Sequence, residues 1–231
     1  MSASTGHALD AAAARRIARA FLPSRWFGNR THYFYALAKL RSDPLYPGVI
    51  DALRGSEAPL LDLGCGIGLL AHALRDAGLH LAYRGVDIDA RKIKLALRAS
   101  TTTQLQDVAF ECIDLATTIP AHRGSVAILD VLQFVSPQAQ DTILDAAVAM
   151  LVPGSRLVLR TGLDDGSARA HTTRRIDVLS RHLRWMNAGP QRYPGADALR
   201  ARFEAAGLAC EITPLYGRTP FNNWRVVATK S

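Results

Sequence analysis

LLDLGCGIGLL, residues 60–70, is the stretch that decides the fold of this chain of 231 residues. Its first four residues form the end of a predicted buried strand, and an apolar helical pattern begins at Leu69. A strand, a glycine loop and a helix in this order direct backbone N–H groups toward a bound ligand. Glycine permits the sharp turn and the close approach that such a loop needs. The loop contains three glycines at alternate positions, Gly64, Gly66 and Gly68.

The spacing of these glycines separates two classes of ligand. A dinucleotide-binding loop reads G-x-G-x-x-G, which from Gly64 would need a glycine or alanine where Leu69 stands. The pattern is instead D-x-G-x-G-x-G, with Asp62 two residues before the first glycine. A carboxylate at that position repels a pyrophosphate and attracts a cation. The loop therefore favours a positively charged ligand.

Length and composition bound the class of protein. With 231 residues, 48% of them hydrophobic and 21% charged, the chain has the size of about one α/β domain with a small cap. No apolar run approaches the roughly 20 residues that span a bilayer. Residues 1–16 lack the apolar segment of a secretory signal. We therefore expect no membrane span and a cytoplasmic location.

The cysteines and histidines follow no metal-binding or disulfide pattern. The seven histidines lack ligand spacing, and the three cysteines lie far apart, at Cys65, Cys112 and Cys210. We expect neither a bound metal nor a disulfide. Cys65 stands inside the glycine loop, where we interpret it as a small residue that fits rather than as a redox group.

The net charge of +8 is concentrated in two segments. Residues 11–41 contain seven basic residues and no acid, and residues 166–192 contain six basic residues and one acid. The rest of the chain is net acidic. The two segments either steer acidic partners toward a shared surface or are simply solvated basic helices, and composition does not separate these interpretations.

From residue 59 onward, short apolar runs alternate with segments of helical length. This alternation is typical of βαβ units and a parallel sheet. The predicted strands are 60–63, 81–87, 108–113, 126–130, 156–160, about 208–214 and 223–229. The predicted helices are 68–77, 90–99 and 137–151, with a further helix that ends near Gly207.

The N-terminal part has a different pattern. Residues 9–22 form a predicted amphipathic helix, and an aromatic stretch over 26–35 follows it. A turn marked by two prolines leads to another predicted helix that starts at Gly48. The aromatic stretch suits either a cover over a substrate or a packed helical layer.

The two patterns suggest a division of the chain. We predict an N-terminal helical cap over residues 1–55 and an α/β domain over residues 56–231. The second basic segment would form a helical insertion in this domain, at about residues 164–194.

Further carboxylates follow predicted strands, at the edge where a parallel sheet binds its ligand. Asp87 comes about 20 residues after the glycine loop, where an acid accepts hydrogen bonds from both hydroxyls of a ribose. Ile88 beside it offers an apolar surface. Asp114 and Asp130 stand in the same place after two later strands. Together with Asp62, these residues predict a site for a cationic ligand.

This combination resembles the class I S-adenosylmethionine-dependent methyltransferases over residues 59–231. The glycine loop resembles their first motif. LVPGSRLVLR, residues 151–160, is similar to their P-G-G turn before the fifth strand, with Ser155 in place of the second glycine. The resemblance implies a Rossmann-like, seven-stranded and mostly parallel sheet with an antiparallel last strand and helices on both faces. It also implies S-adenosyl-L-methionine as the cofactor.

The resemblance implies a role for each residue of the motifs. It places Asp62 in the network that holds the ammonium group of the cofactor and Asp130 beside the methionine end. It implies that Asp87 binds the ribose of the cofactor. The loop and adenine contacts that it implies are Gly64, Cys65, Gly66, Gly68, Ile88, Asp114 and Leu115.

Three shorter stretches resemble small-molecule methyltransferases of bacterial pigment, aryl polyene and polyketide pathways. They are KLRSDPLYP at 39–47, ILDVLQFVSPQAQ at 128–140 and TPFNNW at 219–224. Such relatives are expected to have a histidine where Gln133 stands. Gln133 is therefore the candidate catalytic residue at this position. Because a glutamine amide cannot accept a proton, it cannot act as a general base.

The resemblance implies methyl transfer to a small or carrier-tethered acidic molecule, by in-line displacement at the sulfonium methyl. Positioning of the reactants supplies most of the acceleration, roughly 7–11 kcal/mol. The candidate substrate contacts are Tyr33, Tyr35, Lys39 and Arg160. Arg160 ends an apolar strand on the ligand side, where it suits either an anionic group of the substrate or a salt bridge.

Two alternatives stay open at this point. RNA is one possible acceptor, because basic segments with aromatic residues also suit a phosphate backbone, although the fourth strand lacks the [ND]-P-P-[YF] signature of base-amino methyltransferases. The other alternative is an accessory protein that binds S-adenosylmethionine without catalysis. The sequence leaves the oligomeric state open.

Overall fold

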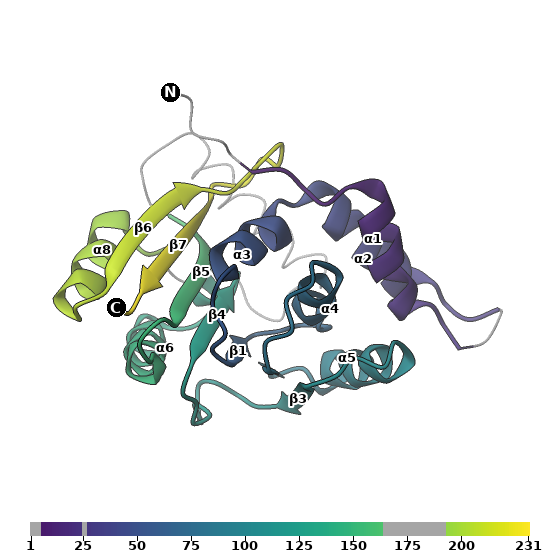
Figure 1. Ribbon diagram of the computed structural model, residues 1–231, viewed down its shortest axis with the longest axis horizontal. Helices are drawn as coiled ribbons and strands as arrows, with labels where there is room; N and C mark the ends of the chain where they lie inside the picture. The colour runs from purple at the N-terminus through teal and green to yellow at the C-terminus, as the bar shows by residue number, and fades with distance from the viewer. Residues whose placement is uncertain (1–5, 25–26, 164–192) are drawn as a thin grey trace.

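A seven-stranded sheet runs through the molecule in the computed structural model, which describes residues 6–24, 27–163 and 193–231 (Figure 1). The strand order is β3-β2-β1-β4-β5-β7-β6. β7 is antiparallel to both of its neighbours, and the other paired strands are parallel. The predicted mostly parallel sheet with an antiparallel last strand is confirmed. The strands are β1 (Leu60–Leu63), β2 (Tyr83–Asp87), β3 (Val108–Cys112), β4 (Ser125–Leu129), β5 (Arg156–Gly162), β6 (Ala209–Pro214) and β7 (Asn223–Thr229).

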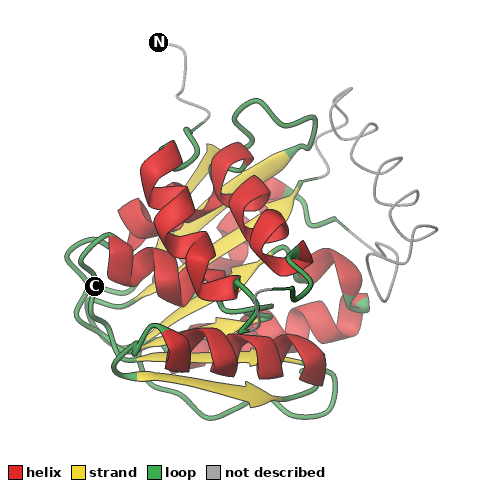
Figure 2. Ribbon diagram, turned by 90° about the vertical axis from the view of Figure 1, so that its right-hand side faces the viewer, coloured by secondary structure: helices red, strands yellow, loops and turns green. Residues whose placement is uncertain are grey.

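Helices cover both faces of the sheet (Figure 2). Within the described residues, five helices and a short 3-10 turn that precede β3 in the chain pack on one face, and two later helices pack on the other. The first group is α1 (Ala11–Ala18), η1 (Arg19–Phe21), α2 (Thr31–Ser42), α3 (Leu45–Leu53), α4 (Leu69–Asp76) and α5 (Ala90–Thr102). The second group is α6 (Pro137–Met150) and α8 (Ala196–Ala205), and a 3-10 turn, η2 (Leu132–Phe134), precedes α6.

Alternation along the strands divides the core in two. Leu60 packs with the N-terminal helices, whereas Leu61 and Leu63 pack with α6 and α8. Because helices cover both faces, the leucines of β1 are fully buried whichever way they point. Asp62 shares the face of Leu60, since side chains two apart on a strand point the same way. A carboxylate therefore lies in an otherwise apolar layer.

The N-terminal helices share this core with the sheet. Ile17 of α1, Phe21 of η1 and Leu53 of α3 belong to the same buried cluster as Leu60 of β1 and Leu70 of α4. Residues from both predicted parts thus pack together, and the boundary at residue 55 stays a prediction. The predicted insertion at about 164–194 lies almost wholly outside the described residues.

The predicted N-terminal helices differ from the observed ones at their ends. The helix expected over 9–22 consists of α1 followed by the tighter turn η1. The aromatic stretch enters α2, and α3 begins at Leu45 instead of Gly48. Pro47 lies in the first turn of α3, where a missing N–H costs no helical hydrogen bond, so it does not delay the helix.

Side chains cap three of the helices. Asp10 Oδ1 accepts hydrogen bonds from the N–H groups of Ala12 and Ala13, both at 2.8 Å, at the start of α1. Asp89 caps α5, and Ser136 caps α6 before a proline at the first helical position. These caps explain why the helices begin where the sequence places a short polar residue. No helix within the described ranges is long and apolar enough to cross a membrane.

A buried histidine links α4 to the N-terminal helices. The ring of His72 meets the ring of Phe21 edge-on, with 5.2 Å between the centroids, and its Nε2 has no hydrogen-bond partner within the described part of the chain. Burial lowers the pKa of His72 to about 4. The neutral ring therefore suits this position, and protonation opposes the packing of η1 on α4.

We expect His72 to make the folded state sensitive to acid. An unfolded histidine binds a proton near pH 6.5, so its contribution to stability is complete above that pH and falls as the pH drops toward 4. The loss between pH 7.5 and 5 should be about 2 kcal/mol. Urea unfolding at both pH values should show this loss in the native chain and a smaller one in His72→Leu. Equal losses in the two proteins would contradict it.

Candidate active site

The glycine loop between β1 and α4 folds back onto β2. The N–H groups of Gly64 and Cys65 both donate to the carbonyl of Val86, at 2.8 and 2.9 Å. Gly64 has a φ of +88°, and a Cβ there would lie 2.2 Å from Cγ2 of Val131, so a side chain does not fit. Gly66 has a φ of +58°, and a Cβ there would enter open space. The loop thus presents bare backbone to a ligand at Gly66.

Asp62 lies beneath this loop with one oxygen unpaired. Its Oδ2 accepts a hydrogen bond from the hydroxyl of Tyr83 at 2.6 Å, while Oδ1 is buried and has no partner within the described residues. Burial raises the pKa of Asp62 to about 7, against the lowering effect of the Tyr83 hydrogen bond. An unpaired buried carboxylate oxygen costs free energy unless a donor or a cation reaches it. Asp62 is therefore suited to a positively charged group.

Asp87 ends β2 and holds the loop in place. Its Oδ2 accepts from the N–H of Gly66 and its Oδ1 from the N–H of Asp89, both at 2.9 Å. A carboxylate has about four lone-pair positions, so two acceptor positions remain for a ligand. The next residue, Ile88, is 59% exposed. A carboxylate and an open apolar surface thus lie next to each other.

The remaining predicted cofactor residues stand around the same edge. Asp114 follows β3, and its Oδ1 accepts from the N–H of Ala116 at 2.9 Å. Leu115 is half-buried against the core on the α6 side. Burial raises the pKa of the Cys65 thiol, which disfavours a reactive thiolate. Gly68, with a φ of +80°, is the residue from which α4 starts.

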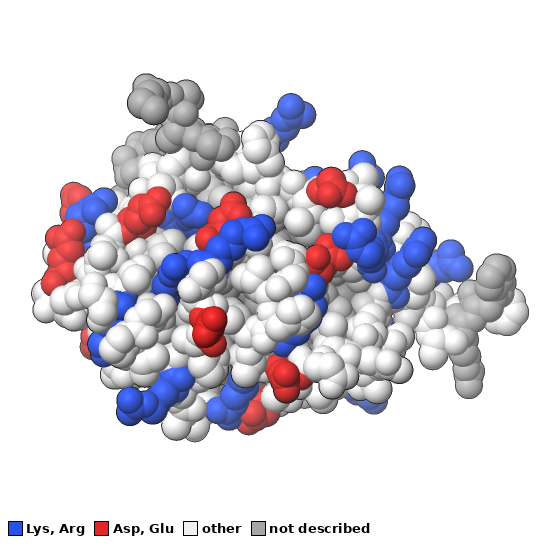
Figure 3. Space-filling model, in the orientation of Figure 1, with Lys and Arg blue, Asp and Glu red and all other residues white. Residues whose placement is uncertain are grey.

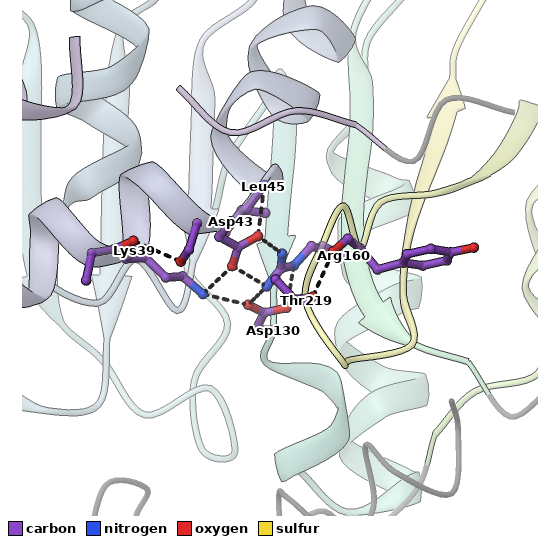
Figure 4. A network of polar contacts seen from close by, with 9 residues as sticks. Lys39, Asp43, Leu45, Asp130, Arg160 and Thr219 are labelled. Carbon is purple, nitrogen blue, oxygen red and sulfur yellow. Dashed lines mark hydrogen bonds and ion pairs between the residues drawn. The ribbon is translucent and has the colours of Figure 1, made fainter. Parts of the chain in front are cut away.

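Four charged residues meet where β4 and β5 end (Figure 4). Arg160 is buried, and its guanidinium donates to both carboxylate oxygens of Asp43 and to both of Asp130, the latter at 2.7 and 2.5 Å. Lys39 Nζ lies 2.7 Å from Asp43 Oδ2 and 3.6 Å from Asp130 Oδ2. We call these four side chains the carboxylate network. Its two positive and two negative charges join α2 to the sheet.

The carboxylate network favours the charged forms of Asp43 and Lys39. Burial alone would raise the pKa of Asp43, but the positive charges of Arg160 and Lys39 lower it to about 2. Burial likewise opposes the charge of Lys39, yet the carboxylates of Asp130 and Asp43 keep its pKa above the usual value. Asp130 takes a left-handed backbone conformation with a φ of +60°. Its N–H donates to the Arg160 carbonyl at 2.8 Å, which supports this uncommon conformation.

The predicted substrate contacts differ in how accessible their side chains are. The guanidinium of Arg160, which we expected to meet an anionic group or a salt-bridge partner, is buried between two carboxylates. Tyr35 is 53% exposed and stands one helical turn before Lys39 on α2, so these two side chains share a face. Tyr33 is half-buried, with its ring 5.2 Å from that of Phe34. Gln133 is buried, and its Oε1 accepts from the hydroxyl of Thr161 at 3.4 Å.

Comparison with known proteins finds similarity to methyltransferases. A family model described as a methyltransferase domain matches residues 60–154. A ubiquinone biosynthesis O-methyltransferase of Xylella fastidiosa (strain 9a5c) is 35% identical over 108 residues, which are 46% of this chain and 42% of that protein. A tRNA (guanine-N(7)-)-methyltransferase of Rubrobacter xylanophilus is 27% identical over 165 residues, which are 66% of this chain and 72% of that protein.

The fold agrees with these matches. The crystal structure of magnesium protoporphyrin IX methyltransferase from Synechocystis PCC 6803 with bound SAH is similar over 94% of this chain and 93% of that one, with a TM-score of 0.61 and 16% identity. Residues 60–154 thus match a methyltransferase domain, and the chain as a whole resembles the class I S-adenosylmethionine-dependent methyltransferases in sequence motifs and fold. The chain spans less than half the length of the ubiquinone relative, 42%.

The site fits the cofactor of this family in two respects. The unpaired, buried Oδ1 of Asp62 offers a partner to an ammonium group. The open space at Gly66, above the N–H held by Asp87, leaves the backbone accessible where other residues would place a side chain. The described part of the chain contains no cluster of side chains suited to a metal ion.

Sequence reasoning missed two residues of the site. Tyr83 was read only as part of an apolar strand, yet its hydroxyl orients Asp62. Asp43 was read as part of a turn before Pro44, and it does accept from the N–H of Leu45 at 3.0 Å. Its second function, as a partner of Arg160, has no local signal because the two residues stand 117 positions apart.

Proposed function

We propose that the methyltransferase transfers a methyl group from S-adenosylmethionine to a small acidic molecule, free or tethered to a carrier. One observation carries this proposal: two buried carboxylates, Asp62 and Asp87, flank an open glycine loop, and an oxygen of Asp62 lacks a partner within the described residues. A cationic ligand would satisfy that oxygen. The family match over residues 60–154 supports the same chemistry.

In this proposal, different residues around the loop contact different parts of the cofactor. Asp62 holds the ammonium group, and the free acceptor positions of Asp87 take the ribose hydroxyls. Ile88 covers the adenine, while Asp114 and Leu115 lie beside it. Asp130 stands at the methionine end, where Arg160 and Lys39 hold its carboxylate in one orientation.

Bound S-adenosylmethionine supplies an electrophilic methyl group on a sulfonium. The protein itself contributes mainly by orienting the reactants, because the described part of the site presents no evident base. The amide of Gln133 cannot take a proton, and it is already in contact with Thr161. An acceptor that is an anion at neutral pH needs no base. For this reason we favour an acidic acceptor, such as a phenol with a low pKa or a carboxylate.

Lys39 and Tyr35 are the proposed contacts of this acceptor. They lie along one face of α2, and the ammonium of Lys39 reaches the carboxylate network without being fully buried. An anionic acceptor would draw Lys39 away from Asp43, whose charge Arg160 still neutralises. Arg160 acts through Asp130 as a positioning residue.

RNA is a second candidate acceptor. The tRNA methyltransferase relative, 72% of which matches this chain, favours it, as do the basic residues of α1 and α2. Single-stranded bases would need aromatic side chains near Asp130, and Tyr35 is available. Strong salt dependence of binding to mixed RNA would distinguish this acceptor from a small molecule.

The test of the proposed function has two parts. Calorimetry with S-adenosylmethionine should give micromolar affinity, about −8 kcal/mol. Mass spectrometry should then show a methylated product within a panel of phenolic and carboxylic acids. Lys39→Met should raise the KM for these acids by a larger factor than it weakens cofactor binding, because Arg160 still holds Asp130. Tight cofactor binding with no product from acids or RNA would instead support a non-catalytic accessory protein.

Cofactor affinity is expected to increase as the pH rises from 6 to 8. Since burial has raised the pKa of Asp62 to about 7, the residue is mostly protonated at pH 6 and cannot pair with an ammonium group. The population of the charged form, and with it the affinity, should rise about tenfold. Asp62→Asn should bind more weakly, with little change over this range. An equal slope in both proteins would show that Asp62 is not the titrating group.

A further inference from the structure

The connection between η1 and α2 carries bulky apolar side chains into solvent. Phe27 is 92% exposed and Phe34, one turn into α2, is 57% exposed; Leu22, after η1, is 38% exposed. The segment of residues 27–30 that leads into α2 lies at the far end of the molecule from α8 (Figure 1). Exposed apolar side chains that gather in one place mark an interaction site more often than scattered ones do.

Exposed basic side chains occur in the same segments of the chain as these apolar groups. Arg15 on α1, Arg19 at the start of η1 and Arg30 just before α2 are exposed, and none of them forms an ion pair within the described ranges. Lys and Arg side chains gather over α1 and α2 in Figure 3. No acid occurs between residues 11 and 42, so nothing local neutralises this charge. We call these three arginines with Leu22, Phe27 and Phe34 the α1–α2 surface.

We propose that the α1–α2 surface docks on an anionic lipid bilayer. Phe27 and Phe34 would enter the boundary between headgroups and acyl chains, and the arginines would pair with the headgroup phosphates. A projecting aromatic residue needs a deformable partner, because a folded protein would have to offer a matching pocket. The charge supports the same occupant, since basic residues near an anionic bilayer strengthen binding additively and in a salt-dependent way.

The position of α2 gives this docking a geometric consequence. α2 begins beside Phe27 and ends near the carboxylate network, since Lys39 and Arg41 both lie in its last turn. Docking would therefore bring one end of the same helix to the bilayer and leave the other at the sheet edge. The inference does not depend on methyl transfer, because it concerns binding alone.

Co-sedimentation of the full chain with vesicles tests the proposal. We expect binding to vesicles of phosphatidylcholine with about 30% phosphatidylglycerol at about 0.1 M salt, and at least tenfold weaker binding at about 0.5 M salt or without the anionic lipid. Phe27→Ala/Phe34→Ala should weaken binding at least tenfold. Arg15→Ala/Arg19→Ala should weaken it by roughly 25-fold, since one basic residue is worth about a factor of five.

Two control variants remove similar groups elsewhere. Leu97→Ala removes a leucine that is 46% exposed on α5, and Arg123→Ala/Arg200→Ala removes two exposed arginines outside the α1–α2 surface. Both should bind vesicles like the native chain, and all variants should keep the native melting temperature. Absence of vesicle binding, or native binding by Phe27→Ala/Phe34→Ala, would overturn the proposal. Tighter binding to mixed RNA or to an acidic protein than to these vesicles would also overturn it.

Discussion

Replacing Asp87 with asparagine is expected to weaken the binding of S-adenosylmethionine at least about 100-fold, or roughly 2.7 kcal/mol. Both carboxylate oxygens accept N–H groups of the backbone, from Gly66 and from Asp89. Asparagine can accept only one of them, because its amide nitrogen would face the other donor. The loop would then lose its clamp, and the ribose would lose charge-assisted hydrogen bonds, which are the strong ones.

Calorimetry of Asp87→Asn beside a matched variant checks this expectation. Asp141→Asn makes the same chemical change in an exposed pair with Arg202 on the α6 side, so it should bind the cofactor like the native chain. Thermal unfolding would establish that Asp87→Asn is folded at the temperature of the titration. If Asp87→Asn bound within threefold of the native chain, the assignment of the ribose to Asp87 would be wrong.

Arg160→Met should lower the free energy of unfolding by about 3–5 kcal/mol. The guanidinium is buried and neutralises two carboxylates, of which Asp43 is also buried. Methionine keeps much of the volume but leaves Asp43 and Asp130 with Lys39 as their sole cationic partner within the described network. The cost is therefore that of uncompensated buried charge, not that of a lost surface ion pair.

The chain offers a close control for this variant. Arg202 also binds two carboxylates, those of Asp141 and Asp145, but it lies at the surface, so Arg202→Met should cost about 1 kcal/mol or less. Urea unfolding of both variants at pH 7 gives the comparison. The carboxylate network of the native chain should weaken only in strong acid, since the pKa of Asp43 is lowered to about 2 and its stabilising effect is lost as the pH falls from about 3.8 through that value. Equal losses of unfolding free energy in Arg160→Met and Arg202→Met would show that the burial of Arg160 is not the cause.

Local sequence patterns were sufficient for the loop and the strand ends. Asp62, Gly66 and Asp87 lie in segments whose apolar runs set the strands, and parallel strands bring their carboxyl ends to one edge. The predicted sheet is therefore confirmed, and Asp87 and the loop meet as hydrogen-bond partners 21 positions apart. Nothing beyond the order of strand, loop and helix is needed to bring them together.

The carboxylate network shows where such reasoning ends. Arg160 stood out because a charged residue in an apolar strand is unusual, but the sequence does not say whether its partner is a ligand or another side chain. The partner is Asp43, which reaches Arg160 only when α3 and β5 pack together, because Asp43 and Arg160 are distant in sequence. The start of α3 at Leu45 also depended on packing, because its apolar residues are buried against the sheet.

The separation of 117 positions between Asp43 and Arg160 has a consequence for the newly synthesised chain. On the ribosome, the glycine loop and the first parallel strands emerge well before β5, and until then Asp43 and Asp130 lack their shared arginine. Contacts of such long range form late and slow the search for the native state. The carboxylate network is thus completed only after β5 has been synthesised, which exposes this edge of the sheet to misassembly during translation.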